Sequence, residues 1–533
     1  MGDTHNRTPE VGTETQLLID DHVVDEIWLI RRAPEMPVKH MNNPVFDSAY
    51  GNTIIYDEEE RIFKMWYGIG IPGTYEAQGA YAVSDDGIQW EKPDMGLVEY
   101  EGSKKNNLIS TNGFGSIMKD HWDPDPQRKY KMMTKRKNTE VSEGRAFAAF
   151  SADGINWQNH PGEKAIVRDA GDGNGMVLYD ETIRKYVNFR RPTIRAGGGV
   201  RTGDIGFPDG HVMKDAGGSN RSAPEGVGFP LEDDFVLHEE AEDYIHRYLR
   251  PAPYIDTRAL RIYKDKGEEE RGASLRCNRR VARAESEDFL NWTEPEVILR
   301  PDELDPPKFY SMSVSKYCGM YLGLVQVYNA WGFRRYPGCP QESETIDIHL
   351  AFSRDGWRWE RLANRPVFIP RGYIGSFDGG MICQSNPPLI EYGDEIRFYY
   401  QGQSGSHNAP VRDMADISRE GGIGVARLSK ERIVARTAGD EVGALLTKPF
   451  KLEGKSLEIN ANASKGLIKV EVTDPIGKPI EGFSAKEAEE IRSNESRHPV
   501  AWKNKKTLEE IAGQTIRLRF FMLDSRLYSF KFS

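Results

Sequence analysis

This 533-residue sequence has few cysteines, no long apolar run and no excess of basic residues. Its four cysteines (Cys277, Cys318, Cys339 and Cys383) are scattered and form no Cys-x-x-Cys pair, which argues against a disulfide scaffold and a cysteine-based metal site. No apolar stretch approaches the roughly 18 residues that a membrane-spanning helix needs. The formal net charge is −11, and no basic patch indicates nucleic acid as a partner.

The N-terminal segment is also short of apolar residues. Residues 1–14 lack the apolar core of a signal peptide, so the sequence predicts a cytoplasmic protein or one whose export signal has been removed. Glycine (52 residues) and proline (30 residues) are abundant, and aromatic residues make up 10%. This composition is typical of a folded, turn-rich all-β protein.

A short pattern, Ser-x-Asp-Gly-x-x-Trp, recurs along the chain and is called the tag below. Clear tags occupy residues 84–90, 151–157 and 353–359, and a degenerate tag occupies 286–292. Their final tryptophans are 67, 135 and 67 residues apart, which indicates a repeat of about 67 residues with one tag missing. Asp-Gly favours a tight turn, the serine can bond the same turn, and the tryptophan can pack between sheets. We interpret the tags as structural markers.

Alternating strand patterns accompany the repeats. The first unit reads as a strand at 52–57, a turn, a second strand at 62–68 and a third at 80–84 that leads into its tag. Four further units follow, and an irregular insertion that we expect to overhang the active face interrupts the third of the five units. The predicted domains are a tail over residues 1–15, five antiparallel units over 16–440 with the insertion at 192–276, and a β-sandwich over 441–533.

Five meander units with these tags resemble the five-bladed β-propeller glycoside hydrolases, the superfamily of invertase-like (family 32) and arabinofuranosidase-like (family 43) enzymes. Besides the tags, the resemblance rests on residues 64–68, 128–132, 309–314 and 376–381, and it covers roughly residues 15–440. It implies a five-bladed propeller that cleaves a furanose-type or acidic glycan from one end, with carboxylates as acid and base, and the alternating strands after residue 441 predict the C-terminal β-sandwich. A carbohydrate is the implied partner, and no cofactor or metal motif accompanies it.

One motif departs from that family. Invertase-like enzymes carry Trp-Met-Asn-Asp-Pro-Asn-Gly near the N-terminus, with the aspartate as nucleophile. In this sequence the similar stretch at 40–47 has Asn43 in place of that aspartate. The nucleophile of that family therefore has no carboxylate counterpart at position 43, and Asp47, four residues later, is the available substitute.

Position must separate the catalytic candidates from the other acids, because there are 82 acidic residues. In propellers of this kind the innermost strand of each blade starts at the ligand face, so candidates precede first strands or follow second strands. Glycosidase chemistry needs one carboxylic acid and one carboxylate. The rule selects Asp47, Asp172 and Asp378 as catalytic candidates. Acids at the far ends of first strands are set aside, namely Asp57, Asp120, Asp123, Asp125 and Asp180.

The same rule selects Arg190, Arg191, Asp305, Gln403 and His407 as substrate-binding candidates. Tyr310 is a further candidate as a sugar-stacking aromatic, with packing in the core as the alternative. The arginine pair would suit a carboxylate or sulfate on a sugar. Alternatives stay open, because each aspartate can instead cap a turn or close a blade through a salt bridge, and the arginines can be a solvated surface pair. Two other functions also stay open, namely a glycoside phosphorylase, in which arginines and a histidine hold phosphate, and a non-catalytic carbohydrate-binding propeller. The oligomeric state is not predicted.

Overall fold

The computed structural model describes the chain from residue 8 to 533, except for 48–49, 71–76, 111–113, 135–145, 161–165, 168–174, 192–204, 207–211, 214–279, 303, 307, 330–344, 374, 406 and 408–420. Asp172 and nearly all of the predicted insertion lie outside the described residues. The all-β prediction is confirmed, since the described part contains strands and only two short 3-10 helices, η2 (Pro126–Arg128) and η4 (Glu509–Ile511). No helix within that part is long and apolar enough to cross a membrane.

Three antiparallel four-stranded sheets, called units one to three, follow one another along the chain. Unit one contains β6 (Tyr50–Asp57), β7 (Ile62–Gly70), β8 (Ala77–Ser84) and β9 (Leu108–Ser110). Unit two contains β10 (Ser116–Lys119), β11 (Tyr130–Thr134), β12 (Phe147–Ser151) and β13 (Gln158–Asn159). Unit three contains β14 (Met176–Asp180), β15 (Lys185–Arg190), β18 (Val281–Ser286) and β19 (Glu296–Leu299), and β16 (Ile205–Gly206) pairs separately with β17 (Val212–Met213).

An eleven-stranded sheet comprises two antiparallel parts, called units four and five. A single parallel pairing, between Ile346 and Met381, joins the two parts. Unit four contains β20 (Lys308–Tyr317), β21 (Met320–Asn329), β22 (Thr345–Ser353), β23 (Glu360–Arg361) and β24 (Val367–Ile369). Unit five contains β25 (Met381–Gln384), β26 (Ile390–Tyr392), β27 (Glu395–Gln403) and β28 (Gly421–Ser429), and it is completed by β4 (Val38–Lys39) and β5 (Phe46–Asp47) from the N-terminal region.

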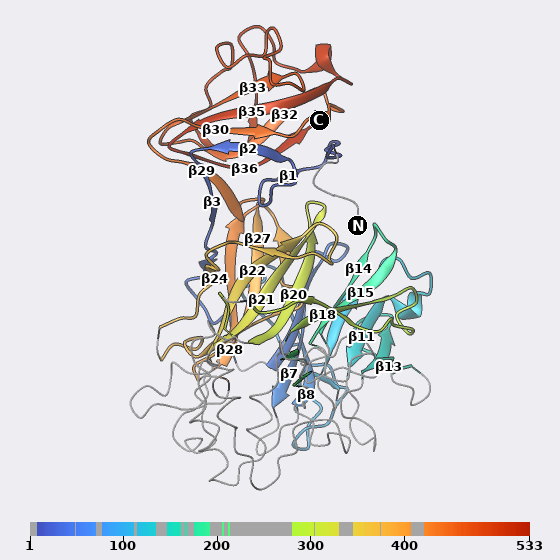
Figure 1. Ribbon diagram of the computed structural model, residues 1–533. Helices are drawn as coiled ribbons and strands as arrows, with labels where there is room; N and C mark the ends of the chain where they lie inside the picture. Colours follow the sequence, from blue (N-terminus) through green and yellow to red (C-terminus); the bar gives the residue numbers. More distant parts are fainter. Residues whose placement is uncertain are drawn as a thin grey trace.

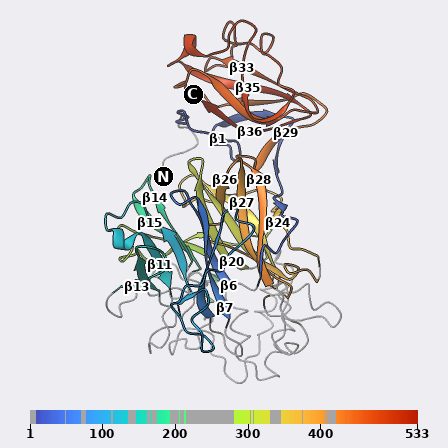
Figure 2. The same cartoon turned by 180° about the vertical axis from the view of Figure 1, so that it is seen from behind.

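The first strands of the units lie next to one another. Strand β6 contacts β10, β10 contacts β14, β14 contacts β20, and β6 also contacts β26 and β27. A bridge between Thr53 and Asn386 joins unit one to unit five. Figures 1 and 2 show the sheets standing side by side from both directions. The contacts therefore run from each unit to the next and return from the last to the first.

The C-terminal segment forms two further sheets, drawn in orange and red in Figure 1. One contains β1 (Gln16–Leu17), β3 (Ile30–Pro34), β29 (Val434–Ala438), β32 (Leu457–Asn462), β34 (Asn494–Pro499) and β36 (Ser525–Phe532). The other contains β2 (Val24–Trp28), β30 (Gly443–Thr447), β31 (Phe450–Lys451), β33 (Leu467–Thr473) and β35 (Thr515–Leu523). Alternate residues of β35 (Ile516, Leu518, Phe520 and Met522) are buried in a core that β32 and β36 share, as expected for one inward face.

The sequence analysis assigned residues 16–34 to the propeller, but β1, β2 and β3 pair with C-terminal strands. The contact between the two regions is polar as well as apolar. Glu431 accepts hydrogen bonds from Arg497, at 2.9 Å, and from Ser529 on β36, while its backbone N–H donates to the Tyr317 hydroxyl at 2.8 Å. This buried carboxylate therefore connects the end of β20 to the C-terminal sheets.

Each tag forms a turn in which its aspartate accepts from two backbone N–H groups. In the tag at 151–157 the Ser151 hydroxyl accepts from the Gly154 N–H at 2.9 Å, and Asp153 accepts from two backbone N–H groups at 2.8 Å each. The Trp157 indole then donates to the Gly154 carbonyl at 2.9 Å. Gly154 has φ +78°, a conformation that glycine adopts without steric cost.

The tags also join the units. In three tags a backbone carbonyl accepts a hydrogen bond from a side chain of the preceding unit. Trp66 of unit one donates to the Gly154 carbonyl at 2.6 Å, and Arg128 of unit two to the Asp288 carbonyl at 3.1 Å. Arg283 of unit three donates to the Asp355 carbonyl at 2.8 Å. The tag of unit one receives its bond from unit five, where Tyr399 donates to the Gly87 carbonyl at 2.9 Å. The tags are therefore hydrogen-bond acceptors between successive sheets.

Candidate functional site

Three predicted substrate-binding residues from three units lie together near the starts of the first strands. Tyr310 is on β20, Arg191 follows β15 and His407 follows β27. The His407 ring nitrogen Nε2 lies 3.2 Å from the Tyr310 hydroxyl, and the Arg191 guanidinium lies 5.6 Å from the centre of the Tyr310 ring. The ring of Tyr328, on β21, contacts both Tyr310 and His407. We call Arg191, Tyr310, Tyr328 and His407 the mouth cluster.

Arg190 does not join the mouth cluster. It is the last residue of β15 and only 2% exposed, whereas Arg191 is half-buried. Successive side chains on a strand point to opposite faces, so the Arg-Arg pair divides between the sheet interior and the cluster. Gln403, the last residue of β27, is buried opposite Met381 at the start of β25, and its carbonyl accepts from the Gly380 N–H at 2.9 Å.

The carboxylate of Asp378 is buried and accepts hydrogen bonds from three side chains. Its carboxylate accepts from Lys39 at 2.6 Å, from Tyr400 at 3.0 Å and from Ser376 at 2.9 Å. Burial and the adjacent carboxylate of Asp378 raise the pKa of Tyr400, which keeps its hydroxyl protonated as a donor. Since β4 carries Lys39 and pairs with β28, these contacts fit the salt-bridge alternative for Asp378.

Asp305 is likewise buried in an arginine network. Its carboxylate pairs with Arg361 and lies 3.8 Å from Arg365, and it accepts from the Asp302 N–H at 3.1 Å. His349 lies 3.2 Å from Arg361 on the other side. Burial and the neighbouring arginines lower the pKa of His349 to about 3, so its ring is neutral at physiological pH. Asp305 therefore serves to neutralise arginines of unit four.

Asp47 is the catalytic candidate whose carboxylate is exposed. It ends β5 opposite Gly422 and lies three residues ahead of β6. Asp172 lies outside the described residues. The catalytic roles of these residues stay predictions, as does the suggestion that Asp47 and Asp378 face each other across a channel.

Sequence reasoning missed a carboxylate at the start of β22. Asp347 accepts from Asn329 at 2.6 Å and from Arg371 at 2.9 Å, and Arg371 also donates to the Gly379 carbonyl at 2.9 Å. Asn329 directly follows Tyr328 of the mouth cluster, so Asp347 connects that strand to the segment before β25. The available signal was an acid at the start of a third strand, a position that the rule did not consider.

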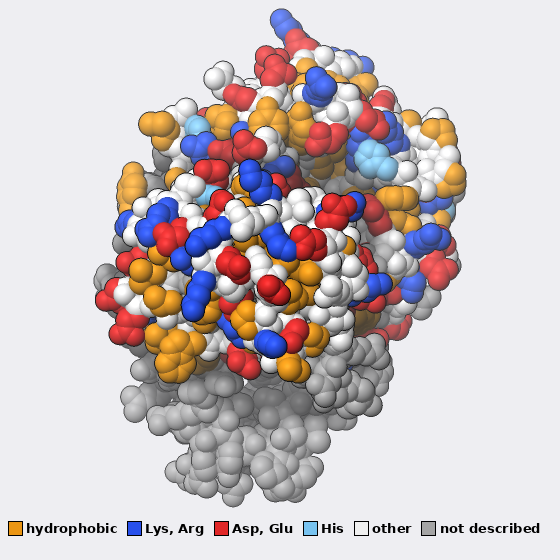
Figure 3. All heavy atoms as spheres, turned by 90° about the horizontal axis from the view of Figure 1, so that it is seen from above, with side chains coloured by type: hydrophobic (Ala, Val, Ile, Leu, Met, Phe, Trp, Pro, Cys, Tyr) orange, Lys and Arg blue, Asp and Glu red, His pale blue; other side chains and the backbone are white. Residues whose placement is uncertain are grey.

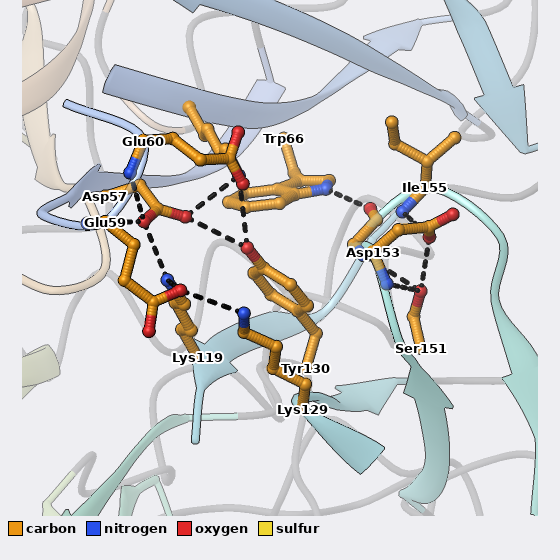
Figure 4. A network of polar contacts seen from close by, with 12 residues as sticks. Asp57, Glu59, Glu60, Trp66, Lys119, Lys129, Tyr130, Ser151, Asp153 and Ile155 are labelled. Atoms are coloured by element: carbon orange, nitrogen blue, oxygen red, sulfur yellow. Dashed lines mark hydrogen bonds and ion pairs between the residues drawn. The ribbon is translucent and has the colours of Figure 1, made fainter. Parts of the chain in front are cut away.

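Three of the acids that were set aside, Asp57, Asp120 and Asp180, form buried networks between units. Asp57 accepts from Lys64 at 2.9 Å, from Lys119 of unit two at 2.7 Å and from the Tyr130 hydroxyl at 3.2 Å (Figure 4). Burial alone would raise the pKa of Asp57, but hydrogen bonds from Lys119 and Lys64 hold it well below its usual range. Asp120 repeats the arrangement with the Tyr186 hydroxyl at 2.6 Å.

No metal-binding group of three His, Cys, Asp or Glu side chains occurs in the part of the chain that the structure describes. Cys318 and Cys383 are unbridged, and burial raises the pKa of each thiol to about 12. Both thiols are therefore poor nucleophiles and metal ligands at physiological pH.

No family model and no curated protein matches this sequence. Among solved structures, the chain is similar to an N-acetylgalactosamine deacetylase from F. plautii in complex with blood group B trisaccharide, with 14% identity, a TM-score of 0.40 and coverage of 76% of this chain and 97% of that one. It is also similar to a thermostable family-43 glycoside hydrolase, with 11% identity, a TM-score of 0.40 and coverage of 74% and 95%. Such values assign neither an activity nor a residue's role.

Proposed function

We propose that units one to five form a five-bladed β-propeller and that residues 16–34 with 434–533 form a β-sandwich. The cyclic contacts between first strands and the hydrogen bonds from each unit to the next tag support the propeller. A single apolar core shared by the two C-terminal sheets supports the sandwich. These domain bounds differ from the division at residue 440 that the sequence alone predicts.

We infer that the protein is a glycoside hydrolase whose substrate binds at the mouth cluster. The observation that carries this proposal is the meeting of Arg191, Tyr310 and His407 from three units. An aromatic ring supplies a surface for the apolar face of a sugar, while a histidine and an arginine supply directed hydrogen bonds to its hydroxyl or acidic groups. The arginine favours a glycan that carries a carboxylate or sulfate.

Among the catalytic candidates, Asp47 has the most suitable surroundings. Its carboxylate is exposed, whereas Asp378 and Asp305 are neutralised by Lys39 and Arg361. Asp172 is the proposed partner of Asp47, from the sequence rule alone. We propose that one carboxyl group protonates the leaving oxygen and that the other acts as base or nucleophile.

The test is turnover of a panel of aryl furanosides, aryl pyranosides and aryl uronides. We expect release of the aryl group from at least one member, and Asp47→Asn should lower kcat by about two to four orders of magnitude without changing Tm. Asp440→Asn, a change at an exposed acid near the C-terminal sheets, is the matched control. Sugar binding by calorimetry without turnover of any panel member would contradict hydrolysis and favour the carbohydrate-binding alternative.

A glycoside phosphorylase is the second candidate function, because an arginine and a histidine both lie against Tyr310. Those are side chains that can hold inorganic phosphate as the attacking group. Turnover that requires phosphate and yields a sugar phosphate would favour this reading. Turnover that is independent of phosphate and yields the reducing sugar would favour hydrolysis.

A further inference from the structure

A cavity of about 450 Å³ opens at the other ends of the first strands, where β6, β10 and β14 finish. Strands β6, β10, β14 and β20 and the segment 386–391 line it, so all five units contribute. Its deeper wall is apolar, with buried side chains such as Ile117, Val314 and Ile390. This end of the strands lies on the side of the C-terminal sheets in Figure 1, opposite the mouth cluster.

The rim of the cavity carries an aromatic pair and several acids. Trp122 is 55% exposed and stacks on Tyr179, with ring centres 5.6 Å apart and an interplanar angle of 21°. Glu58 and Glu181 are exposed at the same rim, and neither has an ion-pair partner among the residues that the structure describes. Figure 3 views the molecule from the side of the C-terminal sheets, and acidic and basic side chains are interspersed over the surface that it shows.

The two lysines that line the cavity do not cancel this negative charge. Lys119 is bound to Asp57 at 2.7 Å, and Lys316 lies 3.2 Å from Asp180. Each ammonium group is therefore neutralised by a buried carboxylate beneath the rim. The carboxylates of Glu58 and Glu181 remain as uncompensated charge.

A buried hydroxyl supplies a second, independent indication of a ligand. Ser315 lines the cavity and is 7% exposed, yet its hydroxyl has no hydrogen-bond partner among the described residues. Such a group costs free energy unless water or a ligand satisfies it. A ligand with a polar atom along or at the end of its chain would do so.

We propose that this cavity binds an organic ammonium ion that carries an apolar chain. The cationic head lies between the exposed indole of Trp122 and the carboxylates of Glu58 and Glu181, an arrangement that attracts ammonium groups through the ring face and through charge. The chain lies along the apolar wall of the cavity. This site is separate from the mouth cluster and does not depend on the proposed hydrolase activity.

The test titrates the full-length protein with tetramethyl-, butyltrimethyl- and hexyltrimethylammonium, using calorimetry and tryptophan fluorescence. We expect one site per chain and an affinity that rises about fourfold for each methylene that enters the cavity. Hexanesulfonate, with the same chain and the opposite charge, should not bind. Equal binding of hexanol and hexyltrimethylammonium, or no binding of either, would overturn the proposal.

Three variants assign the binding to the cavity. Trp122→Ala and Glu181→Gln should each weaken hexyltrimethylammonium at least tenfold, and Ser315→Leu should abolish the dependence on chain length by filling the cavity. Trp28→Ala and Glu441→Gln change an exposed tryptophan and an exposed acid elsewhere and should leave the affinity unchanged. The proposal is wrong if Trp122→Ala, with an unchanged Tm, binds as tightly as the unaltered protein.

Discussion

The ammonium group of Lys39 lies 2.6 Å from the carboxylate of Asp378, although 339 residues separate them in the sequence. Lys39 is on β4 at one edge of unit five, whereas Asp378 precedes β25 at the other. The Asp378 side chain is only 4% exposed, so the loss of either partner leaves a charge with little solvation.

We therefore expect Asp378→Asn and Lys39→Met each to lower the free energy of unfolding, by about 2 kcal/mol, a value reduced from that of a fully buried pair because Lys39 is partly exposed. The double variant should lose less than the sum of the two, since both remove one interaction. Urea unfolding of the three variants measures this coupling. Loss of turnover in Asp378→Asn with unchanged unfolding would instead make Asp378 a catalytic residue.

Substitution of the adjacent residues Arg190 and Arg191 should have different effects, the first on stability and the second on ligand binding. Arg190 is 2% exposed, and we expect Arg190→Met to lower the free energy of unfolding by on the order of 3 kcal/mol because it removes a charged group from a buried position. Arg191→Met should leave Tm nearly unchanged and raise KM or Kd for an acidic glycan at least tenfold. Thermal unfolding and ligand titration of both variants check the pair. A destabilised Arg191→Met protein that keeps its affinity would remove Arg191 from the binding site.

The lowered pKa of the tag aspartate Asp153 predicts how the stability of the protein changes at low pH. Burial alone would raise the pKa of Asp153, but hydrogen bonds from the backbone and side chain of Asn156 lower it to about 2, from an ordinary value of 3.8. Because the folded-state pKa is the lower one, the stabilisation is present above about pH 4 and is lost as the pH falls through about 2. The stability difference between the natural protein and Asp153→Ala should shrink over that window. A difference that stays constant from pH 5 to pH 2 would contradict it.

The bonds between units can be compared with those inside a tag. Trp66 is fully buried and donates to the Gly154 carbonyl of the next unit, whereas Trp359 is half-buried and donates to Gly356 within its own tag. Trp66→Phe should therefore cost about 2–4 kcal/mol, from the unsatisfied carbonyl and the space left behind. Trp359→Phe should cost less than half as much. Equal losses in denaturant unfolding would mean that the bond to the neighbouring unit adds nothing.

Sequence patterns predicted local features well. The tags could be predicted because Ser151, Asp153 and Gly154 bond one another within a few residues. The strands could be predicted because alternation is also local. The rule on strand ends selected Arg191 and His407, which the structure places against Tyr310, although no contact among the three was predicted.

Partners distant in the sequence could not be predicted. Nothing near Asp378 in the chain indicates Lys39, and nothing in residues 16–34 indicates pairing with β29, β30 and β36. Which strand pairs at a sheet edge depends on contacts between distant parts of the chain, and local periodicity does not carry that information. For the same reason an exposed acid such as Asp47 and a neutralised one such as Asp378 look alike before folding.

The N-terminal strands have a consequence for how the chain is made. Strands β1, β2 and β3 need partners between residues 434 and 532, and β4 and β5 need β28. During synthesis, the first 47 residues therefore leave the ribosome hundreds of residues before any of their hydrogen-bonding partners exist. Units one to five can be completed only after β28 is translated, and the two C-terminal sheets only after β36. A nascent chain stalled before β28 would therefore present several unpaired strand edges to chaperones.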